Sequence, residues 1–210
     1  MDWEMVTLSN GIPLVMQEKK EQYSVAAGVW VRAGSRYETP AISGISHYIE
    51  HMLFKGTEHR STREIKEAIE GRGGSFNAFT SEEFTAYYVK VVPRYLQIGL
   101  DVLSDMMQHP LFLPEEIEKE RSVIIEEIKM YYDNPARYVH DLFDSLIFDG
   151  HPLGMLVSGT EESVSAISRD DMRAFMQKYY TSAQMCVSVC GNFDRDLLMT
   201  WAETYFGSIR

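Results

Sequence analysis

Residues 44–57 read GISHYIEHMLFKGT, and the rest of the chain is best interpreted outward from this stretch. Apolar residues recur at helical spacing over about residues 43–54, which predicts an amphipathic helix. His47 and His51 are four positions apart, so their imidazoles lie one turn apart on one face of that helix. Glu50 follows His47 by three positions and shares the face. The segment therefore predicts two imidazoles and one carboxylate on the same side of a helix.

This arrangement is typical of a metal-dependent hydrolase. Two histidine nitrogens at this spacing can reach one tetrahedral zinc ion at about 2.0–2.1 Å. A carboxylate beside the metal, without being a ligand, can act as the general base that hydrolysis requires. The order His-x-x-Glu-His inverts the commoner His-Glu-x-x-His but uses the same helical stripe. A solvated helix face with an ordinary His–Glu contact is the alternative, and a catalytic zinc needs a third protein ligand.

The predicted helix Pro114–Tyr132 offers candidates for that ligand. Four apolar residues of this helix define a stripe that faces the core: Ile117, Ile124, Ile128 and Tyr131. Glu126 lies about 160° around the helix from Ile124, so it should face solvent. Glu127 and Glu120 lie only about 60° and 40° from Ile124 and should look inward. An inward-facing acid must find a cation or hydrogen-bond donors. A metal held by the two histidines would serve, and so would Arg or Lys at the edge of the helix packing.

Strands and helices occur in unequal blocks, which favours an α+β fold in which an antiparallel or mixed β-sheet packs against several α-helices. The first three strands are expected to form a β-meander. No linker-like stretch interrupts residues 1–210, which predicts a single domain. The expected strands are 6–9, 13–17, 24–31, 75–79, 84–92 and 185–190, and the expected helices are 43–54, 62–70, 95–108, 114–132, 137–147, 169–179 and 195–205.

The composition excludes several classes of function. The chain has 20 Lys+Arg and 31 Asp+Glu, a net charge of −11, with no basic cluster, so it is not expected to bind nucleic acid. No window approaches 18 uninterrupted apolar residues, and the N-terminus lacks the pattern of a secretory or transit signal, so we expect no membrane insertion. Cys186 and Cys190 are expected to be two buried thiols, too far apart along one strand to form a disulfide.

The remaining histidines have no partner at ligand spacing along the sequence. We therefore expect a surface or packing role for each of them: His59, His109, His140 and His151.

Three stretches together resemble a known family. They are residues 47–57 (HYIEHMLFKGT), 73–80 (GGSFNAFT) and 120–128 (ERSVIIEEI), and they are similar to the N-terminal half of a pitrilysin-family metallopeptidase, an inverted zincin. The similarity is greatest to the branch of mitochondrial processing peptidase and its bacterial relatives. It continues through residues 151–154 and 159–160 and covers essentially the whole chain.

The resemblance implies a set of site residues. His47, His51 and Glu127 would bind one zinc ion per chain, with Glu50 as the general base that activates the zinc-bound water and Glu120 supporting the site. A peptide substrate would add as a further strand to an edge strand that contains four residues: Asn77, Ala78, Phe79 and Thr80. The alternative for these four residues is a strand paired on both sides.

The implied function is that of a zinc endopeptidase domain that hydrolyses unfolded peptides or presequence-like segments. The alternative is a non-hydrolytic peptide-binding or assembly subunit of a larger complex. Family members resemble a clamshell of two homologous halves, and residues 1–210 correspond to the first half, the catalytic domain. A second half is therefore the expected partner, either in the same polypeptide or as a homo- or hetero-dimer subunit. The expected location is the bacterial cytoplasm, with the mitochondrial matrix after transit-peptide removal as the alternative.

Overall fold

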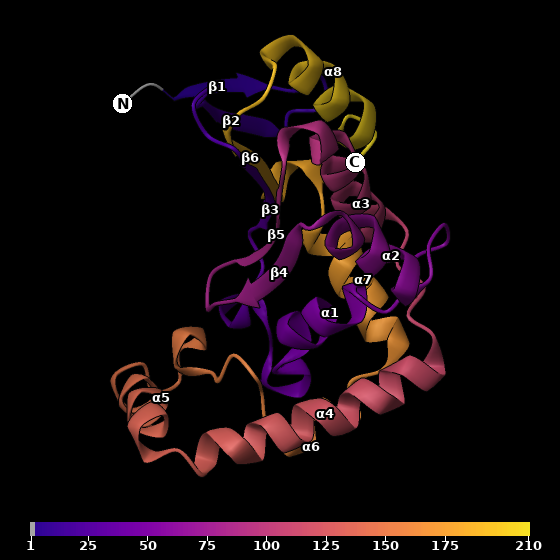
Figure 1. Ribbon diagram of the computed structural model, residues 1–210. Coiled ribbons are helices and arrows are strands. Elements are labelled where there is room, and N and C mark those ends of the chain that lie inside the picture. The colour runs from indigo at the N-terminus through magenta and orange to yellow at the C-terminus, as the bar shows by residue number, and fades with distance from the viewer. Residues whose placement is uncertain (1–2) are drawn as a thin grey trace.

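The computed structural model describes residues 3–210 and contains one six-stranded mixed sheet. Figure 1 shows most of the helices on one side of the sheet, with the helices of residues 114–132 and 135–147 below it. The strand order is β1-β2-β6-β3-β5-β4. The strands are β1 (Glu4–Thr7), β2 (Pro13–Glu18), β3 (Val25–Val31), β4 (Ser75–Thr80), β5 (Thr85–Val91) and β6 (Met185–Gly191). The α+β prediction with a mixed sheet is confirmed.

The prediction of an opening β-meander was wrong. β1 and β2 form the expected antiparallel hairpin, but β6 lies between β2 and β3, parallel to the first and antiparallel to the second. Three alternate residues of β6, Met185, Val187 and Val189, are buried, so this strand belongs at the centre of the sheet. Strand order depends on such non-local pairing, which the spacing of neighbouring strands along the chain does not reveal.

The described residues form eight α-helices, which cover the buried face of the sheet or extend from it: α1 (Ile45–Leu53), α2 (Thr62–Ile69), α3 (Leu96–Gln108), α4 (Pro114–Tyr132), α5 (Pro135–Ile147), α6 (Glu161–Ala166), α7 (Arg169–Tyr179) and α8 (Arg195–Phe206). The predicted bounds of α4 and α7 match those observed. The sequence reasoning missed α6, a short helix capped reciprocally by Thr160 and Ser163.

Within the described part of the chain, no helical layer covers the opposite face of the sheet. Along β3, Val25, Ala27 and Val29 are buried, whereas Ala26 and Trp30 are exposed. This alternation explains why the prediction of two buried thiols was wrong. Cys186 is half-buried and Cys190 is exposed, because both belong to the uncovered face. Both are free thiols, as expected. Among residues 3–210, no helix is both long and apolar enough to cross a membrane.

Helix α1 is anchored at its N-terminus and through its buried face. Its N-terminus has no side-chain cap of its own, and instead the backbone N–H groups of Gly44 and Ser46 donate to the Glu38 carboxylate at 2.7 and 2.9 Å. Burial raises the pKa of Glu38 to about 7. Tyr48 is fully buried and donates a hydrogen bond to the Ile117 carbonyl, which ties α1 to α4. α1 also packs against β4 and β5, so its histidines are held at fixed positions relative to the sheet.

Candidate active site

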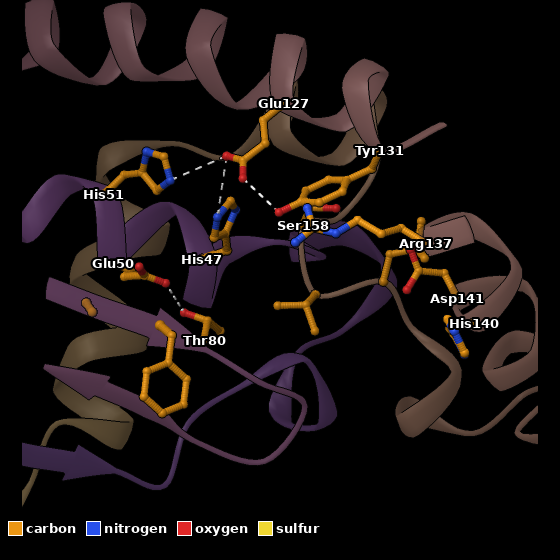
Figure 2. Close-up of a pocket in the computed structure, with 14 residues that line it drawn as sticks. His47, Glu50, His51, Thr80, Glu127, Tyr131, Arg137, His140, Asp141 and Ser158 are labelled. Carbon is orange, nitrogen blue, oxygen red and sulfur yellow. Dashed lines mark hydrogen bonds and ion pairs between the residues drawn. The ribbon is translucent and has the colours of Figure 1, made fainter. Parts of the chain in front are cut away.

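Two helices bring three potential zinc ligands together. His47 and His51 project from α1 toward Glu127 of α4, as Figure 2 shows. The Nε2 atoms of His47 and His51 each lie 3.7 Å from the same carboxylate oxygen, Oε2 of Glu127. One ligand atom from each of the three residues lies within 4.8 Å of the other two. Two imidazoles and one carboxylate that line a pocket are a donor set that could hold a zinc ion.

The hydrogen bonds around His51 leave its Nε2 atom free to bind a metal. His51 Nδ1 lies 3.1 Å from Oε2 of Glu120, so we place the proton on Nδ1 as the donor and the lone pair on Nε2. Lys55 Nζ lies 2.5 Å from the other Glu120 oxygen. Burial raises the pKa of Glu120, but the hydrogen bonds from Lys55 and His51 outweigh it and leave the pKa below its usual value. Glu120 is therefore ionised and helps to orient the His51 ring that it contacts.

His47 is held in its neutral form. Burial, together with a smaller effect of the neighbouring His51, lowers the pKa of His47 to about 4 against the opposing effect of Glu127. Its Nδ1 atom is buried and has no hydrogen-bond partner among the described residues. A neutral imidazole is the form that binds a metal. The ring is therefore ready to bind a metal through Nε2 without first losing a proton.

Glu50 lies on the same helix but takes no part in the ligand cluster. Its Oε2 accepts a hydrogen bond from Thr80 Oγ1 of β4 at 2.6 Å. Burial raises the pKa of Glu50, although the Thr80 bond opposes this. A carboxylate that lines the pocket beside the ligands, with its pKa shifted toward neutrality, suits a general base.

The structure separates the two candidate acids of α4 as the helical wheel predicts. Glu127 is half-buried beside the histidines, whereas Glu126 is exposed and pairs with Lys129 at 2.8 Å. Glu120 is buried and pairs with Lys55, so the prediction of an inward-facing acid paired with a cation also holds.

β4 is an edge strand, because β5 is its only neighbour in the sheet order. Ala78, Phe79 and Thr80 line the pocket, whereas Asn77 is not among its lining residues. The Asn77 side chain instead accepts a hydrogen bond from the backbone N–H of Ala78 at 2.9 Å. The edge position favours strand addition over the alternative of an inner strand paired on both sides.

The sequence reasoning missed the far wall of the pocket. The pocket has a volume of about 500 Å³, and the residues opposite β4 come from the end of α4, from α5 and from the loop before α6: Tyr131, Arg137, His140, Asp141, Leu156, Val157 and Ser158. Tyr131 donates a hydrogen bond to Glu127 Oε1 at 2.9 Å. Because Tyr131 follows Glu127 by one helical turn, the sequence did contain a signal for this contact. The α5 and loop residues offered no such signal.

The prediction for the remaining histidines holds only in part. His151 is exposed, with Nδ1 accepting from the Leu153 backbone, as expected for a surface residue. His140 is exposed and lines the pocket. His59 and His109, which were expected to have no ligand-like partner, meet at Asp105 with their ring centroids 4.7 Å apart. Asp105 and His109 are four positions apart, so the sequence did contain a signal for their contact. The approach of His59 is non-local, because the turn after α1 folds back onto the end of α3.

Comparison with known families gives a consistent result. Residues 14–161 match the family described as Insulinase (Peptidase family M16), and residues 166–210 match the Peptidase M16 inactive domain. The chain is 46% identical over 202 residues to the uncharacterized zinc protease YmxG of Bacillus subtilis, covering 96% of this chain and 49% of that protein. It is 40% identical to an uncharacterized zinc protease of Streptomyces coelicolor, covering 95% of this chain and 44% of the relative.

Solved structures agree with these relatives. A crystal structure of a protease from Helicobacter pylori has a TM-score of 0.94 and 26% sequence identity, and the match covers 100% of this chain and 51% of that one. This chain thus spans about half the length of the relatives it matches. The match to the family covers most of the chain and includes both helices that form the site. The chain belongs to the insulinase-type peptidase family M16.

Proposed function

We propose that this chain is the catalytic half of a zinc endopeptidase that cuts unfolded or presequence-like peptides. The convergence of His47, His51 and Glu127 on one point, with Glu50 beside them and outside the ligand cluster, carries the proposal. The family and the names of the bacterial relatives support a zinc protease. Residues 1–210 would form one catalytic domain with one zinc ion at these three residues.

The donor set fits zinc, because two imidazoles and one carboxylate can converge on a tetrahedral ion. A zinc ion bound there would supply Lewis-acid polarisation of the scissile carbonyl and a water of lowered pKa. Glu50 accepts the proton of the attacking water and later passes it to the leaving amine. Its hydrogen bond from Thr80 fixes the direction in which the carboxylate points. Glu120 keeps the proton of His51 on Nδ1.

The substrate would lie along β4 as an added strand. Backbone groups at the free edge of β4 give affinity without demanding a particular sequence, which suits unfolded peptides. The Ala78 N–H, now bonded to the Asn77 side chain, would exchange that bond for one to the peptide. The Ala78 and Thr80 side of the strand borders the pocket, so a peptide there would place its backbone close to Glu50.

A second homologous half is the partner that we propose, since the relatives are about twice as long as the chain. Every residue of α5 is exposed or half-buried, although the helix carries a row of apolar side chains: Val139, Leu142, Phe143, Leu146 and Ile147. α5 also contributes Arg137 and His140 to the pocket, so a half that covers the apolar side chains of α5 would lie next to the site. The bacterial origin of these relatives supports the bacterial cytoplasm rather than the mitochondrial matrix.

The test compares the wild-type chain with Glu50→Gln, each loaded with zinc, alone and joined to a second half. Cleavage of an unfolded fluorogenic peptide and bound zinc are measured on the same samples. The wild type should cleave, and a chelator should abolish cleavage. Glu50→Gln should keep its zinc and lose about 10²-fold or more in rate. Full activity in Glu50→Gln refutes the general base, and tight peptide binding without cleavage in every wild-type assembly favours the non-hydrolytic subunit.

A further inference from the structure

A second group of metal-ligating side chains lies outside the pocket just described. We propose that His59, Asp105 and His109 bind a second divalent transition-metal ion. One ligand atom from each residue lies within 4.8 Å of a ligand atom of the other two residues, as in the cluster of His47, His51 and Glu127.

The three residues come from separate parts of the chain that are fastened together. His59 lies in the turn between α1 and α2, Asp105 lies in the last turns of α3, and His109 directly follows α3. The backbone N–H of Glu58 donates to the His109 carbonyl at 2.9 Å, next to a β-bridge between Thr57 and Pro110. These backbone bonds hold the two histidines on adjacent segments before any ion binds.

The distances between the histidine nitrogens and the carboxylate oxygen resemble those of the candidate active site. His109 Nδ1 lies 3.1 Å and His59 Nε2 lies 4.0 Å from Oδ1 of Asp105, compared with 3.7 Å for each His–Glu127 distance. Ligand atoms around a tetrahedral zinc ion lie about 3.3 Å apart. The Asp105–His109 pair is already close to this spacing. His59 Nε2 must approach Asp105 Oδ1 by about 0.7 Å to reach this spacing, and its exposed side chain on a turn can do so.

Hydrogen bonds orient the Asp105 carboxylate in the way expected of a metal ligand. The side chain is 4% exposed. Its Oδ2 accepts hydrogen bonds from Thr57 Oγ1 at 2.7 Å and Arg60 Nη1 at 2.6 Å. These bonds fix the carboxylate so that Oδ1 faces the two imidazoles, which is how neighbouring donors commonly orient metal ligands. The positive charge of Arg60 also reduces the attraction for a cation, so this site should be weaker than the one at Glu127.

The donor chemistry selects the class of ion. Two imidazoles and one carboxylate suit Zn²⁺, Co²⁺, Ni²⁺ or Cu²⁺ rather than Mg²⁺ or Ca²⁺, which prefer oxygen ligands. His59 is exposed, so an ion can enter from solvent and complete its coordination with water. A bound ion would link the turn after α1, which contains His59, to the end of α3.

The test is a calorimetric titration of the metal-free chain with Zn²⁺. The wild type should bind one tight and one weaker equivalent. His59→Asn and His109→Asn should each weaken the second equivalent by about tenfold or more and leave the first unchanged. His151→Asn, an exposed histidine outside both clusters, is the matched control and should leave both equivalents unchanged. The second equivalent should also raise the Tm of the wild type and of the control, but not of the two variants.

Absence in the wild type of any equivalent beyond the one held by His47, His51 and Glu127 overturns the proposal. So does a second equivalent that both His59→Asn and His109→Asn retain at full affinity, since the ion would then lie elsewhere. The result is independent of the catalytic proposal. If His47, His51 and Glu127 bound no zinc, a single equivalent that is lost in His59→Asn would still support the second site.

Discussion

Replacing Tyr131 by Phe should weaken zinc binding although Tyr131 is not itself a ligand. Its hydroxyl donates to Oε1 of Glu127 at 2.9 Å, while Oε2 of the same carboxylate faces His47 and His51, as Figure 2 shows. The hydrogen bond therefore fixes which oxygen of Glu127 is presented to the metal. Tyr131→Phe removes the donor and leaves the ring in place, so the carboxylate becomes free to rotate.

The structure sets the size of the effect. A hydrogen bond to a charged group contributes about 1.5–3 kcal/mol. Tyr131 is only half-buried, so the lower end of this range applies. About 1.5 kcal/mol corresponds to roughly a tenfold loss of zinc affinity.

Competition with a fluorescent zinc chelator measures that affinity directly. Tyr132→Phe is the matched control, because Tyr132 is the next residue of α4, is 45% exposed and packs against Tyr138 rather than Glu127. Tyr131→Phe should release zinc at about a tenth of the chelator concentration that Tyr132→Phe requires. Equal affinities in the two variants would refute the idea that Tyr131 positions Glu127.

Two further predictions concern the N-terminus of α1. The pKa of Glu38 rises from 4.5 to about 7 on folding, so the folded state holds more protons between these values and the free energy of unfolding falls as pH rises through them. Urea unfolding should therefore show that the free energy of unfolding of the wild type falls by about 3 kcal/mol between pH 4.5 and pH 7, relative to the non-titrating Glu38→Gln. The same pH dependence of the unfolding free energy in both proteins would contradict this. Gly44→Ala should destabilise the protein by about 1–3 kcal/mol more than Gly11→Ala. Both glycines have a positive φ, but their surroundings differ. An added Cβ would lie 2.6 Å from the Ser158 carbonyl oxygen at Gly44, whereas at Gly11 it would have nothing within 4 Å. Equal losses of Tm in the two variants would disprove the close contact.

Local helix geometry explains which parts of the site could be predicted. The face of α1 and the bounds of α4 follow from side-chain spacing within one element. That spacing distinguishes Glu127 from Glu126, and the structure places Glu127 beside His47 and Glu126 beside Lys129. The role of these residues in zinc binding stays a prediction.

What could not be predicted depends on non-local packing. The position of β6 between β2 and β3 follows from how the sheet buries its apolar face, and no spacing along the chain specifies it. The contribution of α5 to the pocket depends on the direction in which the chain leaves α4. The meeting of His59 with Asp105 likewise requires the turn after α1 to fold onto α3.

Zinc binding by Glu127→Gln and by Glu126→Gln tests the central claim most directly. The two residues are adjacent in α4, but only Glu127 approaches the histidines, and Glu126 is exposed. The account predicts that elemental analysis after dialysis against a weak chelator finds the tight zinc equivalent in the wild type and in Glu126→Gln, and finds it lost in Glu127→Gln. Retention of that zinc in Glu127→Gln, or its loss in both variants alike, would contradict the proposed metal site.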